Sequence, residues 1–132
     1  VVFTASMATY ASPLLDKLDP HGYVSFRLFR QACTRTAKGY TKDLSLLGRD
    51  LQSVILIDNS PICYAMQPYN AIPVSTWRKD PTDTELYDLI PILVSLVDIN
   101  DVTTILRQTV WAVEDKSGPL EDLASGCELK VC

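Results

Sequence analysis

The stretch Val54-Ile55-Leu56-Ile57-Asp58-Asn59-Ser60-Pro61 constrains the fold of this chain more than any other part of the sequence. Four consecutive apolar residues, three of them β-branched, predict a short strand that is buried on both faces. Such strands belong to parallel sheets that helices cover, and in these sheets ligands bind beyond the carboxyl ends of the strands. Here a carboxylate and a carboxamide follow the strand, and both are oxygen ligands suited to Mg²⁺. The same four polar and proline residues are also typical of a plain turn.

Length and composition predict one globular domain. The chain has 132 residues, of which 47% are hydrophobic. Because it has neither a signal peptide nor an apolar run of about 18 residues, we expect an intracellular protein, nuclear or cytoplasmic. The four cysteines, interpreted as reduced thiols, contain no Cys-x-x-Cys pair, and His21 is the only histidine. A zinc site is therefore not expected.

Charge is distributed unevenly. Between Arg27 and Arg49 there are six basic residues and one acidic residue, Asp43. This balance favours a phosphate or an acidic ligand, although a solvated face has the same composition. Residues 112–132 hold five acidic residues against two lysines and contain Ser-Gly-Pro. We therefore predict a folded domain over residues 1–110 and an acidic, poorly ordered tail over residues 111–132.

Strands and helices alternate, which predicts an α/β fold with a mainly parallel sheet. Strands are expected at residues 1–6, 23–29, 54–57 and 71–74, the last at a sheet edge because it contains a proline. Helices are expected at residues 7–18, 44–51 and 82–97, and again after a cap at Asp101. Pro13 indicates two short helices in the first of these segments. Thr82 and Glu85 fit a capping box, and Pro91 predicts a bend.

Six blocks of sequence, in this order, carry a resemblance to a known family. They are Phe3-Thr4-Ala5-Ser6, Arg27-Leu28-Phe29-Arg30, Tyr40-Thr41-Lys42-Asp43-Leu44, Leu47-Gly48-Arg49-Asp50-Leu51, Ile57-Asp58-Asn59-Ser60-Pro61 and Asp83-Thr84-Glu85-Leu86. Over about residues 1–108 the chain resembles the FCP/SCP family of protein phosphatases in the haloacid-dehalogenase superfamily. That family includes the small phosphatases of the RNA polymerase II C-terminal domain and the Dullard-type, NLI-interacting-factor-like phosphatases.

The resemblance implies a phosphatase site at the carboxyl ends of the strands. Thr4 would donate a hydrogen bond to a phosphoryl oxygen, and Lys42 would neutralise the phosphate. Asn59 would bind Mg²⁺ directly, and Asp58 would orient Lys42 or a metal-bound water. Each has a plainer alternative, for example a strand-end threonine for Thr4 and a solvated loop lysine for Lys42.

Three further residues are candidates for binding the substrate. By the same resemblance, Arg30 would lie near the substrate phosphate, although a surface role for this arginine is also open. Met7 and Tyr10 would line the entrance to the site. Their place in the apolar pattern of a helix equally predicts core positions.

One departure from the family concerns the reactive group itself. The family's nucleophile and general acid lie in an Asp-x-Asp-x-Thr motif before the Phe-Thr-Ala-Ser block, and these 132 residues contain no Asp-x-Asp. We interpret the sequence as lacking the strand that carries this motif, and predict that the chain as given is inactive. The resemblance places that strand at the centre of the sheet, between the strands that end at Thr4 and Asp58. Its absence would leave two open edges, which could close together, recruit another chain or prevent folding.

Two functions of different classes follow. The first is a Mg²⁺-dependent phosphoserine/phosphothreonine protein phosphatase domain that uses an aspartyl-phosphate mechanism on the RNA polymerase II C-terminal domain or another phosphoprotein. The second is a non-catalytic, phosphoprotein-binding or regulatory module that holds phosphate through Arg30 and Lys42. The expected partners are a phosphoprotein, another copy of the chain through the open sheet and, on the Dullard-type model, a membrane-associated protein. No direct contact with nucleic acid is expected.

Overall fold

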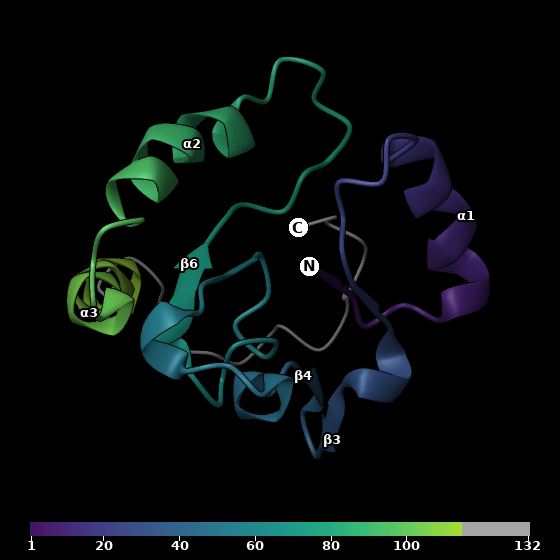
Figure 1. Cartoon of the computed structure of the whole chain (residues 1–132). Helices are drawn as coiled ribbons and strands as arrows, with labels where there is room; N and C mark the ends of the chain where they lie inside the picture. Colours follow the sequence, from purple (N-terminus) through teal and green to yellow (C-terminus); the bar gives the residue numbers. More distant parts are fainter. Residues whose placement is uncertain (115–132) are drawn as a thin grey trace.

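The computed structural model describes residues 1–114 (Figure 1). In chain order the elements are β1 (Val2–Phe3), α1 (Ala8–Leu18), β2 (Arg27–Leu28), the 3₁₀ turn η1 (Arg30–Ala32), β3 (Thr34–Thr36), β4 (Gly39–Thr41), the 3₁₀ turns η2 (Leu44–Leu47) and η3 (Leu51–Ser53), β5 (Leu56–Asp58), the 3₁₀ turn η4 (Pro68–Asn70), β6 (Ala71–Pro73), α2 (Glu85–Ser95) and α3 (Val102–Glu114). No helix in this part of the chain is long and apolar enough to cross a membrane.

The strands form three separate pairs. β1 pairs with β2 in parallel, with Val2 opposite Arg27, and β5 pairs with β6 in parallel, with Leu56 opposite Ala71. β3 and β4 form an antiparallel hairpin. The parallel pairs and the intervening helices confirm the predicted α/β class. The hairpin was not predicted, because it lies in the segment that we interpreted only as a basic loop.

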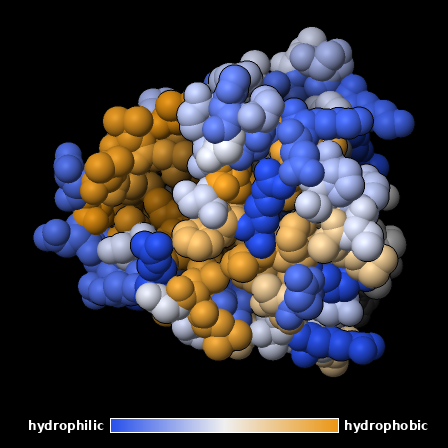
Figure 2. Space-filling view, turned by 45° about the vertical axis from the view of Figure 1, so that its right-hand side comes forward, coloured by the Kyte–Doolittle hydropathy of each residue, from blue (hydrophilic) through white to orange (hydrophobic). Residues whose placement is uncertain are grey.

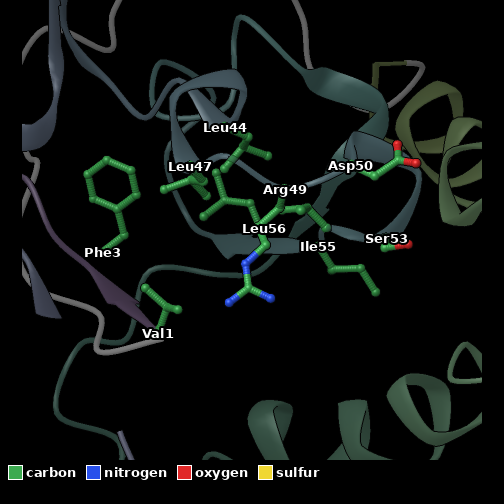
Figure 3. A pocket seen from close by; sticks show the side chains of 10 residues that line it. Val1, Phe3, Leu44, Leu47, Arg49, Asp50, Ser53, Ile55 and Leu56 are labelled. Carbon is green, nitrogen blue, oxygen red and sulfur yellow. The ribbon is translucent and has the colours of Figure 1, made fainter. Parts of the chain in front are cut away.

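A cavity separates β1 from β5. Among the described residues β5 bonds to β6 and β1 to β2, but β1 and β5 do not bond to each other. The cavity has a volume of about 380 Å³. Its walls come from both strands and from η2 and η3: Val1, Phe3, Leu44, Leu47, Arg49, Asp50, Ser53, Val54, Ile55 and Leu56. Figure 3 shows the Arg49 guanidinium projecting into the space between the walls. The two open edges predicted beside this gap have therefore not closed together.

The main core lies between β6 and the two C-terminal helices. Ile72 and Val74 pack with Leu89 of α2 and with Val102 and Leu106 of α3. A second cluster joins the start of η2 to β5 and β6. Beside this buried face, α2 keeps a stripe of apolar side chains that are more than two-fifths exposed, and Val97 continues the stripe just beyond the helix: Leu86, Ile90, Val94 and Val97. On one face of the molecule, Figure 2 shows a broad apolar area with a hollow in it.

The expected bounds of several elements were wrong. α1 is one helix that runs through Pro13, with Met7 as its N-cap, rather than two short helices. The segment that we expected to be one helix from Leu44 to Leu51 is divided into η2 and η3 by Gly48, whose φ of 65° suits a residue without a Cβ. The strand expected at residues 23–29 is limited to Arg27–Leu28.

The two C-terminal helices begin differently. The capping box expected at Thr82 and Glu85 is absent from α2, because Glu85 is its first residue and its carboxylate instead accepts hydrogen bonds from Ser75. Pro91 lies inside the continuous α2. The cap at Asp101 is confirmed, since its Oδ1 accepts from the Thr103 N–H at 3.0 Å. α3 continues to Glu114, and the remainder of the predicted tail, residues 115–132, lies outside the described residues.

Candidate active site

A buried ion pair forms the centre of the site. Lys42 follows β4 and Asp58 ends β5, and they are only 3% and 5% exposed. The Lys42 Nζ donates to Asp58 Oδ2. The other carboxylate oxygen, Oδ1, accepts from the Ser60 N–H at 2.8 Å. The Lys42 backbone is fixed as well, because its N–H donates to the Cys63 carbonyl at 2.8 Å.

The end of β1 reaches the same point. The Lys42 Nζ lies 5.7 Å from the centre of the Phe3 ring, so the carboxyl ends of β1 and β5 meet at this lysine. Thr4, the next residue, is 5% exposed and donates its N–H to the Leu28 carbonyl at 2.8 Å. Its hydroxyl oxygen accepts from the Ser6 N–H at 3.1 Å. Among the described residues the Thr4 hydroxyl donates no hydrogen bond, so its proton can reach an acceptor such as a phosphoryl oxygen.

Asn59 directly follows Asp58 of the ion pair and carries an amide oxygen. Its Nδ2 donates to Thr76 Oγ1 at 3.0 Å, and this bond fixes the plane of the amide. Among the described residues no hydrogen bond reaches Asn59 Oδ1. That oxygen fits a Mg²⁺ ligand, and the Asp58 carboxylate beside it can orient a bound water. No cluster of three His, Cys, Asp or Glu side chains in the described part of the chain could complete such a site. Water, substrate phosphate and further carboxylates would therefore have to supply the remaining ligands.

Arg30 lies beside the loop that follows β1. Its Nε donates to the Ala5 carbonyl at 2.6 Å, and its guanidinium carbon lies 5.2 Å from the centre of the Tyr40 ring. The backbone N–H of Arg30 donates to the Ser6 carbonyl at 3.0 Å. The side chain is exposed, and within residues 1–114 its terminal amino groups make no hydrogen bond. A fixed, exposed guanidinium with donors to spare is suited to a phosphate or a carboxylate.

Met7 and Tyr10 do not occupy core positions. Met7 is 56% and Tyr10 64% exposed, and they lie at the start of α1, just beyond the loop from Thr4 to Ser6. In the part of the chain that the structure describes, no hydrogen bond joins them to Lys42 or Asp58. The core alternative for these residues is therefore wrong, and their role at the entrance to the site stays a prediction.

Two ionisable groups near Lys42 have shifted pKa values. Burial raises the pKa of Tyr64, and the nearby charges of Asp58 and Cys63 raise it further. Hydrogen bonds from Ser45 and Gln67 lower the pKa of Asp43. Both effects favour a neutral phenol and an ionised Asp43 at neutral pH.

The structure also identifies supporting residues that the sequence reasoning missed. Thr76 fixes the amide of Asn59, the Phe3 ring lies beside Lys42, and Tyr40 lies under the guanidinium of Arg30. Phe3 and Tyr40 lie in two of the blocks that carried the resemblance, so these blocks contained a signal for them. Thr76 lies in none of the blocks, and its position becomes apparent only when β6 is paired with β5.

Comparison with known proteins agrees with this geometry. Residues 1–103 match the family model described as NLI interacting factor-like phosphatase. The chain is 50% identical over 109 residues to a probable C-terminal domain small phosphatase of Dictyostelium discoideum, covering 83% of this chain and 36% of that protein. It is 49% identical over 108 residues to the human carboxy-terminal domain RNA polymerase II polypeptide A small phosphatase 1, covering 82% of this chain and 41% of that protein.

A human CTD small phosphatase-like protein is 50% identical over 108 residues, covering 82% of this chain and 39% of that protein. The chain thus spans about two-fifths or less of the length of each of these relatives. The matched region contains all of the site residues described above and has the α/β fold of the haloacid-dehalogenase type. The chain therefore belongs to the family of NLI interacting factor-like phosphatases.

Proposed function

We propose that this chain is the phosphate-binding part of a Mg²⁺-dependent phosphoserine/phosphothreonine protein phosphatase. Its substrate would be a phosphoprotein of the same kind as the RNA polymerase II C-terminal domain, which the name of the human relative mentions. We further propose an intracellular location, in the nucleus or the cytoplasm.

The buried pair of Lys42 and Asp58 carries the proposal. An ion pair this deeply buried contributes little to stability compared with apolar residues of the same size, so it is better explained by function. A phosphate monoester with nearly two negative charges would compete with Asp58 for the Lys42 ammonium group. Lys42 is held from both its backbone and its side chain, so it would meet this charge without reorganising.

The other candidate residues have complementary roles in the proposal. Thr4 donates its hydroxyl proton to a phosphoryl oxygen, and Arg30 binds another through its terminal amino groups. Asn59 and Asp58 would hold Mg²⁺, which when bound supplies positive charge against the phosphate. Met7 and Tyr10 border the site where the peptide enters.

The reactive carboxylate has to come from elsewhere. In the proposed reaction the phosphoryl group passes from a serine or threonine to an aspartate and then to water. No aspartate of residues 1–132 lies in an Asp-x-Asp pair. Phe3 lines the cavity between β1 and β5, and its ring lies 5.7 Å from the Lys42 Nζ, so a strand that filled the cavity could carry the missing aspartate to the phosphate. We therefore propose that the 132-residue chain binds phosphate but does not hydrolyse it.

The second candidate function is a phosphoprotein-binding module without catalysis. The observation that favours it is that the described site provides groups that bind phosphate but no nucleophile. It predicts that a chain extended by an Asp-x-Asp-x-Thr strand would bind phosphopeptides and leave them unhydrolysed, whereas the phosphatase proposal predicts turnover.

Binding of a phosphoserine peptide to the 132-residue chain tests the proposal. The informative variant is Lys42→Met/Asp58→Asn, because it removes both buried charges together and leaves neither uncompensated. Loss of a charge-assisted contact worth about 1.5–3 kcal/mol corresponds to about tenfold to 150-fold weaker binding. Lys17→Met on α1 removes one exposed charge and should leave the affinity unchanged. The measurement is fluorescence anisotropy of a labelled peptide with and without Mg²⁺, with folding checked by circular dichroism. If the folded double variant keeps the wild-type affinity, the assignment of phosphate binding to Lys42 is wrong.

A further inference from the structure

The connection between β6 and α2 forms a rigid rim next to the candidate active site. It is the long loop that arches over the top of the molecule in Figure 1. Residues 75–80, here called the 75–80 loop, begin where β6 ends, and the preceding Val74 N–H donates to the Asp58 carbonyl at 3.1 Å. Thr76 Oγ1 accepts from Asn59 Nδ2 at 3.0 Å. The loop is therefore bonded directly to Asn59, and the residue before it is bonded to Asp58.

Hydrogen bonds fix the shape of the 75–80 loop. At its start the Glu85 carboxylate accepts from the N–H of Ser75 at 2.9 and 3.0 Å and from its hydroxyl at 2.5 Å. At its end the indole Nε1 of Trp77 donates to the Asp80 carbonyl at 2.8 Å. Lys79 adopts a φ of 62°, the only positive φ among the described residues other than glycine. This conformation is unfavourable for a lysine and persists where the surrounding structure imposes it.

The fixed loop presents an aromatic and two cationic side chains to solvent. Trp77 is 51% exposed although it is large and apolar, and Arg78 and Lys79 are exposed as well. In the part of the chain that the structure describes, the ion pairs involve Arg27 and Lys42, and neither Arg78 nor Lys79 takes part in one. Exposed tryptophan and arginine on a preorganised loop are typical of binding surfaces.

The acidic residues around the loop do not neutralise these two cations by pairing with them. Asp80 Oδ1 accepts from the N–H and hydroxyl of Thr82, and Asp83 Oδ1 accepts from the Glu85 N–H. Asp88 Oδ2 accepts from the Thr84 hydroxyl. Together with Glu85, these carboxylates are engaged in forming the loop and the start of α2. These carboxylates keep their charge, but among the described residues none of them forms an ion pair with Arg78 or Lys79, so both cations can contact a ligand.

The length of chain between Thr76 and the two cations limits the spacing between the two acidic groups of the substrate. Lys79 follows Thr76 by three residues, so the backbone between them spans at most about 10 Å. A peptide bound in an extended conformation advances about 3.3 Å per residue. An acidic group that reaches Arg78 or Lys79 would therefore lie about two to four residues from the phosphorylated residue.

We infer that the 75–80 loop binds a second acidic group on the phosphoprotein substrate, two to four residues away from the phosphate held at Lys42. The preferred substrate is then a segment with two phosphates, or with a phosphate and a nearby carboxylate. Arg78 and Lys79 bind the second charge, and Trp77 packs against the peptide between the two charges. This inference rests on the proposed function and adds a substrate preference to it.

Affinities of two peptide series for the 132-residue chain test this inference. One series carries a single phosphoserine, and the other adds a second phosphoserine two, three or four residues to its N- or C-terminal side. The second phosphate at one of these positions should tighten binding about three- to tenfold at low salt, and raising the salt should remove the gain. Arg78→Ala/Lys79→Ala should abolish the gain and leave the affinity for the single phosphate nearly unchanged.

A matched control separates a local effect from net charge. Arg35→Ala/Lys38→Ala removes the same two charge types from exposed positions of the β3–β4 hairpin, and it should keep the gain. Equal binding of the two peptide series, or equal loss of the gain in both double variants, overturns the inference. If the chain binds the single-phosphate peptide through Lys42 but gains no affinity from the second phosphate, the role of the 75–80 loop is wrong and the proposed function still stands. A chain that binds neither peptide contradicts the proposed function as well.

Discussion

Removing one charge of the Lys42–Asp58 pair should destabilise the chain far more than removing both. The two residues are 3% and 5% exposed, so neither charge can be rescued by water when its partner is lost. Lys42→Met keeps the length of the side chain and removes the ammonium group. Asp58→Asn removes the negative charge but keeps a side-chain oxygen for the Ser60 N–H, which donates to Asp58 Oδ1 at 2.8 Å.

The expected magnitudes follow from the burial of the pair. Each single variant leaves one buried charge without its partner in the pair, which costs about 3–5 kcal/mol. The double variant leaves none, and replacing a buried pair by uncharged groups is often close to neutral. If the two changes were independent, the double variant would lose about 6–10 kcal/mol, the sum of two such penalties. We expect a loss of no more than about 2 kcal/mol, and so a coupling energy of at least about 4 kcal/mol.

Urea unfolding followed by circular dichroism measures the cycle. If a single variant is unfolded in buffer, all four proteins are compared in the same concentration of sucrose, which favours the folded state. The pair of Arg27 and Asp16, joined at 2.5 Å with side chains 25% and 67% exposed, provides the control because water reaches both charges. Its cycle, Arg27→Met and Asp16→Asn, should give a coupling energy below about 1 kcal/mol. The double variant could instead lose as much unfolding free energy as the two single variants together, to within about 0.5 kcal/mol. This result would refute the argument that Lys42 and Asp58 depend on each other.

Three further predictions concern the rest of the molecule. The open edges and apolar walls of the cavity should make the 132-residue chain self-associate or unfold easily, so a light-scattering monomer with a cooperative, high-temperature transition would count against that view. Asn70→Ala should lower the free energy of unfolding by about 1–3 kcal/mol, because the buried amide donates to two backbone carbonyls, and an unchanged urea midpoint would show that water replaces it. The lowered pKa of Asp43 adds stability that is fully present above the ordinary carboxyl pKa and is lost as the pH falls through the pKa of Asp43 in the folded chain. Asp43→Asn should therefore reduce the drop in urea midpoint between neutral and acidic pH. An equal drop in both proteins would contradict this prediction.

The sequence predicted those parts of the fold that local pattern determines. The apolar run before Asp58 became β5, and the Asp101 cap is present because it needs only neighbouring residues. The capping box failed because Glu85 found a partner in Ser75, ten residues away, which no local pattern reveals. Pro13 did not divide α1. The buried residues Ala11 and Leu15 pack the turns on either side of Pro13 into the core, and this packing offsets the loss of one backbone N–H donor.

The candidate site was less accessible to sequence reasoning. Lys42 and Asp58 lie 16 residues apart, and composition alone cannot pair them. Their joint role came from the resemblance, whereas their burial and mutual contact came from the fold. Thr76 and the 75–80 loop were not anticipated at all, because their proximity to Asn59 depends on the parallel pairing of β5 with β6.

Restoring a nucleophile tests the central claim most directly. A chain extended before Val1 by the family's Asp-x-Asp-x-Thr strand should hydrolyse a phosphoserine peptide in the presence of Mg²⁺, and the 132-residue chain should not. Lys42→Met/Asp58→Asn in the extended chain should lower turnover about a hundredfold or more, because a preorganised charge is lost. Asn59→Ala should instead raise the Mg²⁺ concentration needed for half-maximal activity, since it removes one ligand. The account predicts that excess Mg²⁺ restores the activity of Asn59→Ala, whereas the double variant, which also loses the Lys42 charge, stays slow at any Mg²⁺ concentration. Unchanged turnover and unchanged Mg²⁺ dependence in both folded variants would contradict it and leave residues 58–61 as an ordinary turn.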